Sequence, residues 1–188
     1  MVTFSSGTAR LWADYIYLDT DERRRFAQVS HEYLIEQIQH QSFSSPTNMS
    51  LKFNHPIKEL IWTREWFREG SNVEGRFEAS VSGNWKLKLN GHDRFAERDF
   101  KYFTRTQIWQ HHTGFGGVTL NKDSIAVYSF ALKPEEHQPS GTCNFSRIDS
   151  AQLVFEGTLA TASTLNIFAV NYNVLRIMSG MGGLAYSN

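Results

Sequence analysis

The chain has 188 residues and a mass of 21.6 kDa, enough for one domain, or at most two small ones, whose core needs no disulfide or metal. Nineteen Lys and Arg balance nineteen Asp and Glu, so no global field draws the chain to nucleic acid or anionic lipid. The single cysteine, Cys143, excludes an intrachain disulfide, no apolar run is long enough for a membrane helix, and the N-terminus lacks signal-peptide features.

A strand followed by a helix is predicted near the N-terminus. Residues 10–18 are aromatic and aliphatic and have the length of a strand. Asp19 can cap a helix, and Glu22 follows three residues later, as in a capping box. Apolar residues then recur close to helical spacing, which predicts one helix or two short ones over residues 21–39: Phe26, Val29, Tyr33, Leu34 and Ile38.

The next segments favour strands separated by loops. Residues 42–48 have a loop composition, and residues 51–62 read as a strand bent at Pro56, which cannot donate to a central ladder. The charged residues 65–75 predict an exposed connection. Trp85, Leu87 and Leu89 alternate with lysines and run into Asn90-Gly91, the strongest short hairpin signal. Residues 92–117 predict a short helix or an irregular packed loop.

Three further strands are predicted at residues 125–132, 150–155 and 164–174. The last has apolar residues on both faces, so we expect it to be buried on both sides or covered by a partner. Residues 178–188 form a glycine-rich tail. Many strands with one or two helices in long connections predict an all-β sandwich.

Three histidine-containing clusters are weak candidates for catalysis or metal binding. His31-Glu32 is predicted on the helix, but Ile35 stands where a zinc protease needs its second histidine, which favours a polar surface pair. His111-His112 are adjacent, and two neighbouring histidines rarely bind one metal; we expect them in a loop packed against Trp109. Glu135, Glu136 and His137 lie between Pro134 and Pro139, which predicts an exposed rigid loop. No catalytic, metal or cofactor site is predicted.

Two surface features remain. Arg23, Arg24 and Arg25 follow two acidic residues, which favours a solvated helix start or ion pairs with a neighbouring subunit over a nucleic-acid patch. Asn48-Met49-Ser50 and Asn144-Phe145-Ser146 fit the N-glycosylation pattern, so Asn48 and Asn144 are candidate glycosylation sites.

Several segments together resemble the C-terminal half of the major capsid proteins of nucleocytoplasmic large DNA viruses, in the order of that family. The resemblance lies in Trp12–Phe26, His31–Gln37, Phe53–Trp62, Leu89–Phe95, Ser129–Asp149 and Asn171–Tyr186. It implies an antiparallel eight-stranded jelly-roll sandwich with one or two short helices in long connections. In that family each subunit carries two such rolls. This chain has room for one, so residues 1–188 are expected to form a single domain equivalent to the second roll, with the N-terminal roll absent.

The resemblance also implies a structural function in an icosahedral virion. We expect a non-enzymatic protein that forms homotrimeric, pseudo-hexagonal capsomers, contacts neighbouring capsomers and minor capsid proteins, and is assembled in the host cytoplasm. No nucleic-acid partner and no membrane insertion are expected. Candidate interface residues are Arg23, Arg24, Arg25, Glu135, Glu136 and His137. Two alternatives stay open: a carbohydrate-binding sandwich with exposed aromatic residues on one face, and a cupin-like metalloenzyme.

Overall fold

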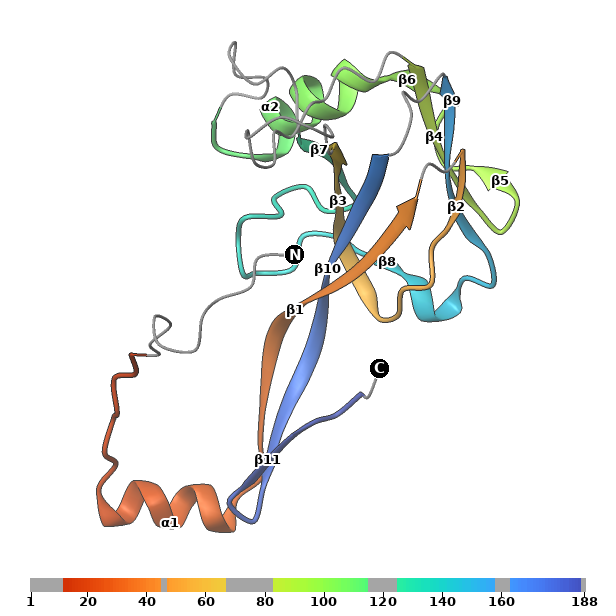
Figure 1. Ribbon diagram of the computed structural model, residues 1–188. Helices are drawn as coiled ribbons and strands as arrows, with labels where there is room; N and C mark the ends of the chain where they lie inside the picture. The colour runs from red at the N-terminus through yellow and green to blue at the C-terminus, as the bar shows by residue number, and fades with distance from the viewer. Residues whose placement is uncertain (1–11, 45–46, 67–82, 115–124, 158–162, 187–188) are drawn as a thin grey trace.

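Two antiparallel β-sheets face each other in the computed structural model, which describes residues 12–44, 47–66, 83–114, 125–157 and 163–186 (Figure 1). The first sheet has the order β1-β10-β3-β7, with bounds His31–Ser44, Ser163–Met178, Pro56–Trp66 and Ile125–Ser129. The second has the order β2-β9-β4-β5, with bounds Asn48–Ser50, Ala151–Gly157, Gly83–Leu89 and His92–Asp93. Apart from the β4–β5 hairpin, neighbours along these two orders are distant in sequence, so the chain crosses repeatedly between the sheets, as a jelly roll requires.

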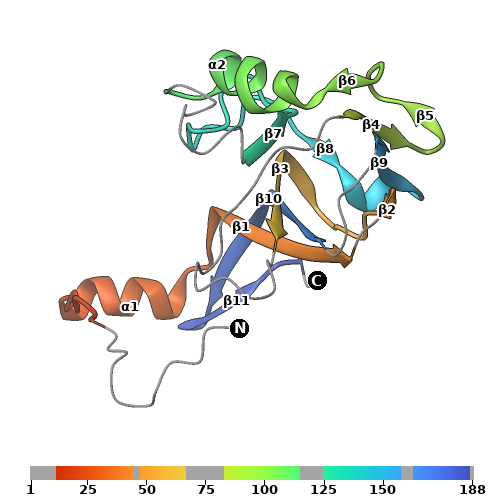
Figure 2. The same cartoon turned by 45° about the horizontal axis from the view of Figure 1, so that its top comes forward.

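Short elements complete the two sheets and their connections. Three brief strands pair at the ends of longer ones: β8 (Cys143–Asn144) on β3, β11 (Met181–Leu184) on β10 and β6 (Arg98–Asp99) on β4. The helical segments of the described residues are α1 (Thr20–Gln28), the π-helical turn η1 (Tyr102–Thr106), α2 (Gln107–His111) and the 3₁₀ turn η2 (Phe145–Arg147). The η1–α2 segment packs beside β7 over one end of the sandwich (Figure 2). The predicted eight-stranded sandwich is therefore confirmed, with short strands added.

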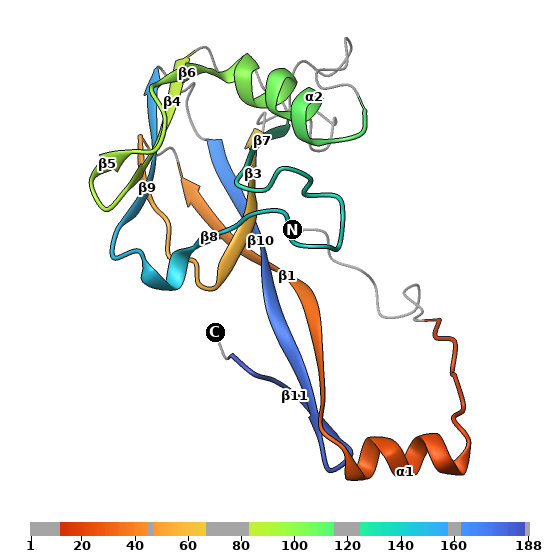
Figure 3. The ribbon, with the colours of Figure 1, turned by 180° about the vertical axis from the view of Figure 1, so that it is seen from behind.

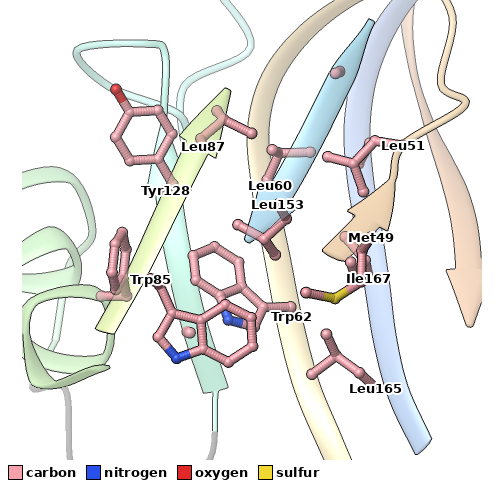
Figure 4. Packing of buried hydrophobic residues seen from close by; sticks show 14 of the residues in the cluster. Met49, Leu51, Leu60, Trp62, Trp85, Leu87, Tyr128, Leu153, Leu165 and Ile167 are labelled. Carbon is pink, nitrogen blue, oxygen red and sulfur yellow. The ribbon is translucent and has the colours of Figure 1, made fainter. Parts of the chain in front are cut away.

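Aromatic rings fill the space between the sheets. Trp62 on β3 and Trp85 on β4 approach from opposite sheets, with ring centroids 5.7 Å apart (Figure 4). Phe103 from η1 lies 5.1 Å from the Trp62 ring and covers one end of this pair. Aliphatic residues continue the core along the strands: Met49, Leu60, Leu87, Leu153, Leu165 and Ile167. This core needs several elements at once, which is why it closes only when both sheets form.

The predicted hairpin after residue 89 is confirmed. Asn90 has φ 52° and Gly91 has φ 80°, the positive values that a tight two-residue turn needs, and the turn joins β4 to β5. The Asn90 side-chain oxygen also accepts hydrogen bonds from the backbone N–H groups of Asp149 and Ser150, at 2.9 and 3.1 Å. The turn thus positions the entrance to β9 as well as reversing the chain.

Strands β1 and β10 continue beyond the sandwich and form an arm (Figures 1 and 3). The arm consists of residues 31–37 of β1, residues 172–178 of β10, and β11. The ladder between β3 and β10 ends at the Ile57–Asn171 pair, and β11 then becomes the neighbour of β10. Helix α1 lies at the tip of the arm, where the N–H of Gly180 donates to the carbonyl of Phe26 at 3.2 Å.

Two predictions about the N-terminal region are wrong. Within the predicted range only Thr20–Gln28 is helical, and residues 31–39 belong to β1, where every residue pairs with β10 and half-buried residues alternate with exposed ones from residue 35 on. His31-Glu32 therefore begins a strand. Residues 12–18 form no strand, because no neighbouring strand among the described residues offers them a ladder, while residues 10–11 lie outside the described ranges.

Other boundaries differ by a few residues. The strand predicted over residues 51–62 begins only at Pro56, the first residue of β3. Residues 51–55 connect it to β2, which ends at Ser50. His55 between them is buried and has φ 68°, a left-handed conformation that cannot continue a strand. Residues 65–66 of the predicted connection belong to β3, and residues 67–75 lie outside the described ranges. The glycine-rich tail contains β11, joined to β10 by a turn at Gly180.

Candidate functional site

Helix α1 presents its arginines to solvent. Asp19 caps the helix as predicted, its side-chain oxygen accepting from the N–H of Glu22 at 2.8 Å. Arg23, Arg24 and Arg25 are all exposed, and Arg24 pairs with Asp21 at 3.5 Å. An exposed pair of this kind adds little stability, so the guanidinium groups remain available for contacts with another molecule.

The corner, defined here as residues 130–143, follows β7 and leads into β8. The N–H groups of Phe130 and Ala131 both donate to the carbonyl of Lys58, at 2.8 and 3.2 Å. Ser140 closes the loop across its base, its hydroxyl accepting from the N–H of Lys133 at 2.9 Å. Pro134 is fully buried, whereas Glu135, Glu136 and His137 after it are exposed, as predicted for that loop.

The candidate residues of the corner point to different partners. Glu135 accepts hydrogen bonds from the N–H and hydroxyl of Thr113, at 2.9 and 2.7 Å. Glu136 pairs with Lys133 at 3.0 Å. The His137 Nδ1 lies 3.8 Å from a carboxylate oxygen of Glu36 on β1. The three side chains thus contact three different partners: Thr113, Lys133 and Glu36.

His112 lies between two carboxylates instead of packing against Trp109. Its Nε2 is 3.0 Å from Glu59 Oε2, and its Nδ1 is 3.2 Å from Glu135 Oε1. Trp109 is three-quarters exposed. His111, the last residue of α2, donates from Nδ1 to the carbonyl of Leu132 at 3.1 Å. The prediction of two loop histidines on Trp109 is therefore wrong, because the end of α2 turns toward β3 and the corner.

Glu59 is the functional residue that sequence reasoning missed. It is buried on β3, and neither its Oε2 nor His112 Nε2 has a well-aligned hydrogen-bond partner, so their ion pair is what compensates both atoms. Lys58-Glu59 inside an otherwise apolar strand was the available signal. Lys58 is also buried, pairing with Glu36 at 2.7 Å and lying 5.7 Å from the ring centroid of Tyr172.

The charges shift two pKa values in this cluster. The carboxylate of Glu59 raises the pKa of His112 above its ordinary value, against the opposing effect of burial, and Glu135 adds to the increase. Hydrogen bonds from Thr113, with a smaller contribution from His112, hold the pKa of Glu135 below its ordinary value. Both carboxylates thus stabilise the imidazolium form of His112, and the imidazolium in turn contributes to the lowered pKa of Glu135.

The two glycosylation candidates lie on the surface. Asn48 begins β2 and is exposed. Asn144 is exposed as well, but its side-chain oxygen accepts from the N–H of Ser146 at 3.1 Å and caps η2. A sugar on the Asn144 amide nitrogen would leave that oxygen in place. Their modification stays a prediction.

Among the described residues, no three His, Cys, Asp or Glu side chains are placed to hold a metal ion. Within the same part of the chain, no helix has the length and apolar character needed to cross a bilayer.

Large apolar side chains on the arm and the preceding segment are exposed. Tyr33, Leu184 and Met181 expose 44%, 47% and 74% of their surfaces, although all lie on paired strands. Residues 12–18 add further exposed apolar groups: Trp12, Tyr15, Ile16, Tyr17 and Leu18. Apolar surface gathered in this way is typical of a protein–protein contact.

The family comparison matches most of the chain. The sequence model described as "Large eukaryotic DNA virus major capsid protein" matches residues 22–183. The major capsid protein of Pyramimonas orientalis virus is 52% identical, over 98% of this chain and 50% of the relative. The major capsid protein of Paramecium bursaria Chlorella virus 1 is 40% identical, over 96% of this chain and 54% of the relative. The chain thus spans about half the length of these curated relatives.

Solved structures agree with the fold. The chain matches a protein of the PBCV-1 virus capsid, a quasi-atomic model, with a TM-score of 0.73 and 37% identity over 93% of this chain and 56% of that one. The Faustovirus major capsid protein matches with a TM-score of 0.54 and 13% identity, which supports the fold alone. These comparisons support neither the carbohydrate-binding nor the cupin-like alternative.

Proposed function

Because this chain belongs to the family of large eukaryotic DNA virus major capsid proteins, we propose that it is a structural unit of a virion shell. The observation that carries the proposal is the PBCV-1 capsid match, which covers 93% of the chain with a TM-score of 0.73. Copies of a rigid sandwich that associate by symmetry can enclose a volume through many individually weak contacts. We further infer that the chain has no catalytic role, since the matched relatives are capsid proteins.

We propose that residues 1–188 correspond to the second of two rolls. Two facts support this assignment: the described residues form one sandwich, and the chain spans about half of its curated relatives. With a first roll in place, we expect three subunits to form a pseudo-hexagonal capsomer that contacts other capsomers and minor capsid proteins. Assembly in the host cytoplasm is part of the same proposal.

The proposed contact surfaces are α1, the corner and the exposed apolar side of the arm. Arg23, Arg24 and Arg25 supply exposed positive charge on α1 at the tip of the arm, where Arg24 also pairs with Asp21. Glu136 and His137 supply exposed polar groups on the corner. Apolar burial provides most of the free energy of association, while the charges set orientation and partner choice.

The test is the mass of the assembled particle in solution. The chain is fused behind the half of the Pyramimonas orientalis virus protein that it does not cover, and light scattering measures the mass of the fusion and of the chain alone. We expect a trimer from the fusion. A fusion that stays monomeric at high concentration would contradict the capsomer proposal.

A charge comparison then tests α1. Changing Arg23, Arg24 and Arg25 together to Ser in the fusion should weaken the trimer. The matched control removes the same charge from exposed positions on the sandwich, Lys52, Lys101 and Arg147, and should leave the trimer intact. Equal trimer stability in both variants removes α1 from the contact surfaces.

A further inference from the structure

Three separate elements meet at the imidazole of His112. Glu59 comes from β3, His112 follows the end of α2, and Glu135 comes from the corner. These two carboxylates lie on opposite sides of the ring, with Nε2 and Nδ1 at 3.0 and 3.2 Å from them. The ring therefore joins the corner to the sheet through two ion pairs.

The protonation state of the ring decides whether it can serve both carboxylates. An imidazolium donates from both nitrogens, whereas a neutral imidazole has one N–H and directs a lone pair from the other nitrogen. Loss of the proton would place that lone pair beside a carboxylate oxygen. Glu59 is buried, so it cannot turn to water for compensation, and the exposed Glu135 is the partner that would move away.

We propose that protonated His112 is a latch that holds the corner against β3, and that pH opens and closes it. Closing fixes Glu135 and the N–H of Thr113, which donates to that carboxylate at 2.9 Å. Opening frees the outer part of the corner, while the bonds from Phe130 and Ala131 to Lys58 keep its base in place. The fold thereby contains a loop with two positions and a titratable group between them.

The other charged groups around the latch are paired among themselves. Lys58 on β3 pairs with Glu36 of β1, which also faces His137 of the corner at 3.8 Å. Within the corner, Lys133 pairs with Glu136. His111 from α2 donates to the Leu132 carbonyl. His137 is an exposed histidine on the corner itself, so it serves as the control.

The pKa shifts define the window in which the latch is closed. The raised pKa of His112 means that its contribution is complete below the ordinary histidine value of 6.5 and is lost as pH rises through the folded value. The lowered pKa of Glu135 means that its contribution is complete above 4.5 and is lost as pH falls through its folded value. The latch is therefore fully closed between pH 4.5 and pH 6.5, and it opens as pH rises through the folded pKa of His112.

Hydrogen exchange on the intact chain tests the latch. Between about pH 6 and about pH 9, exchange of the Thr113 amide, corrected for intrinsic chemistry, should accelerate by up to about tenfold per unit of pH from the ordinary histidine value of 6.5 to the folded pKa of His112, and should level off above it. His112→Gln should exchange fast at every pH, and His137→Gln should behave like the parent. Amides of β4 and β9 in the same sample report whether each variant is folded.

A titration of the unaltered chain gives a second and independent result. The imidazole proton resonances of His112 should report a pKa above 6.5, and Glu135→Gln should lower it. A His112 pKa at or below its ordinary value overturns the proposal. So does a pH dependence of Thr113 exchange that persists in His112→Gln.

Discussion

The sandwich and the arm share two strands, yet only one of the two regions is covered. Where β10 crosses the sandwich, Leu165, Ile167 and Ala169 are buried against the second sheet. Where the same strand enters the arm, its hydrogen-bond ladder continues with β1 and β11, but no second sheet lies over it among the described residues. Tyr33 and Met181 are exposed there as a result.

This contrast separates two requirements that are often met together. A strand needs backbone partners, and β1 supplies them along the whole length of the arm. Burial of an apolar side chain needs a second layer of secondary structure over the sheet, which the sandwich has and the arm lacks among the described residues. We therefore expect substitutions in the sandwich to change folding, and substitutions in the arm to change association.

The largest effect is expected in the sandwich at Trp62. Its ring is fully buried and contacts Trp85 and Phe103, so Trp62→Ala removes the centre of the core and should lower the free energy of unfolding by about 3–5 kcal/mol. Denaturant titration measures the loss. Trp109→Ala, the same change at a largely exposed ring, should stay within about 0.5 kcal/mol. Equal losses would mean that the core lies elsewhere.

Substitution of two glycines with positive φ compares the steric crowding of the corner with that of the tip of the arm. Gly141 has φ 139°, and a Cβ there would lie 2.9 Å from the carbonyl oxygen of Phe130. Gly141→Ala should therefore lower the free energy of unfolding by about 3 kcal/mol, the upper end of the range for backbone strain. Gly180 has φ 76° with open space around it, so Gly180→Ala should lower the free energy of unfolding by only about 1 kcal/mol, the lower end of that range. Thermal unfolding ranks the two, and the reverse order would contradict the structure.

A smaller and local effect is expected at the cap of α1. Asp19→Ala removes the acceptor for the Glu22 N–H and should destabilise the helix by about 1 kcal/mol. Because α1 touches the arm mainly near Gly180, unfolding of the sandwich should not change. Hydrogen exchange of the first helical turn measures the loss. Asp21→Ala, which removes only the exposed pair with Arg24, should cost about 0.5 kcal/mol or less.

The smallest effect on folding is expected on the arm itself. Met181→Ser changes an exposed side chain and should alter the free energy of unfolding by less than about 0.5 kcal/mol, while lowering the binding of a hydrophobic dye. Met49→Ser makes the same chemical change at a fully buried position and should destabilise the sandwich strongly. A large loss of stability in Met181→Ser would show that the arm has cover in solution.

Local patterns in the sequence predicted several features that short-range chemistry controls. Asn90-Gly91 tolerates positive φ, so the β4–β5 hairpin could be read directly. Asp19 with Glu22 marked the start of α1. The aromatic content and the alternation at Trp85 and Leu87 indicated a sandwich with large buried rings. The family resemblance followed from matching segments in order, without any knowledge of contacts.

Tertiary structure decided the features that depend on distant partners. Residues 31–39 carry apolar side chains that suit a helix about as well as a strand, and pairing with β10, 130 to 146 positions away, selects the strand. Residues 12–18 suit a strand but find no partner among the described residues. The meeting of Glu59, His112 and Glu135 was equally invisible, because no local spacing relates β3, α2 and the corner. Backbone hydrogen bonding and charge compensation are satisfied in space, so only the folded chain could assign them.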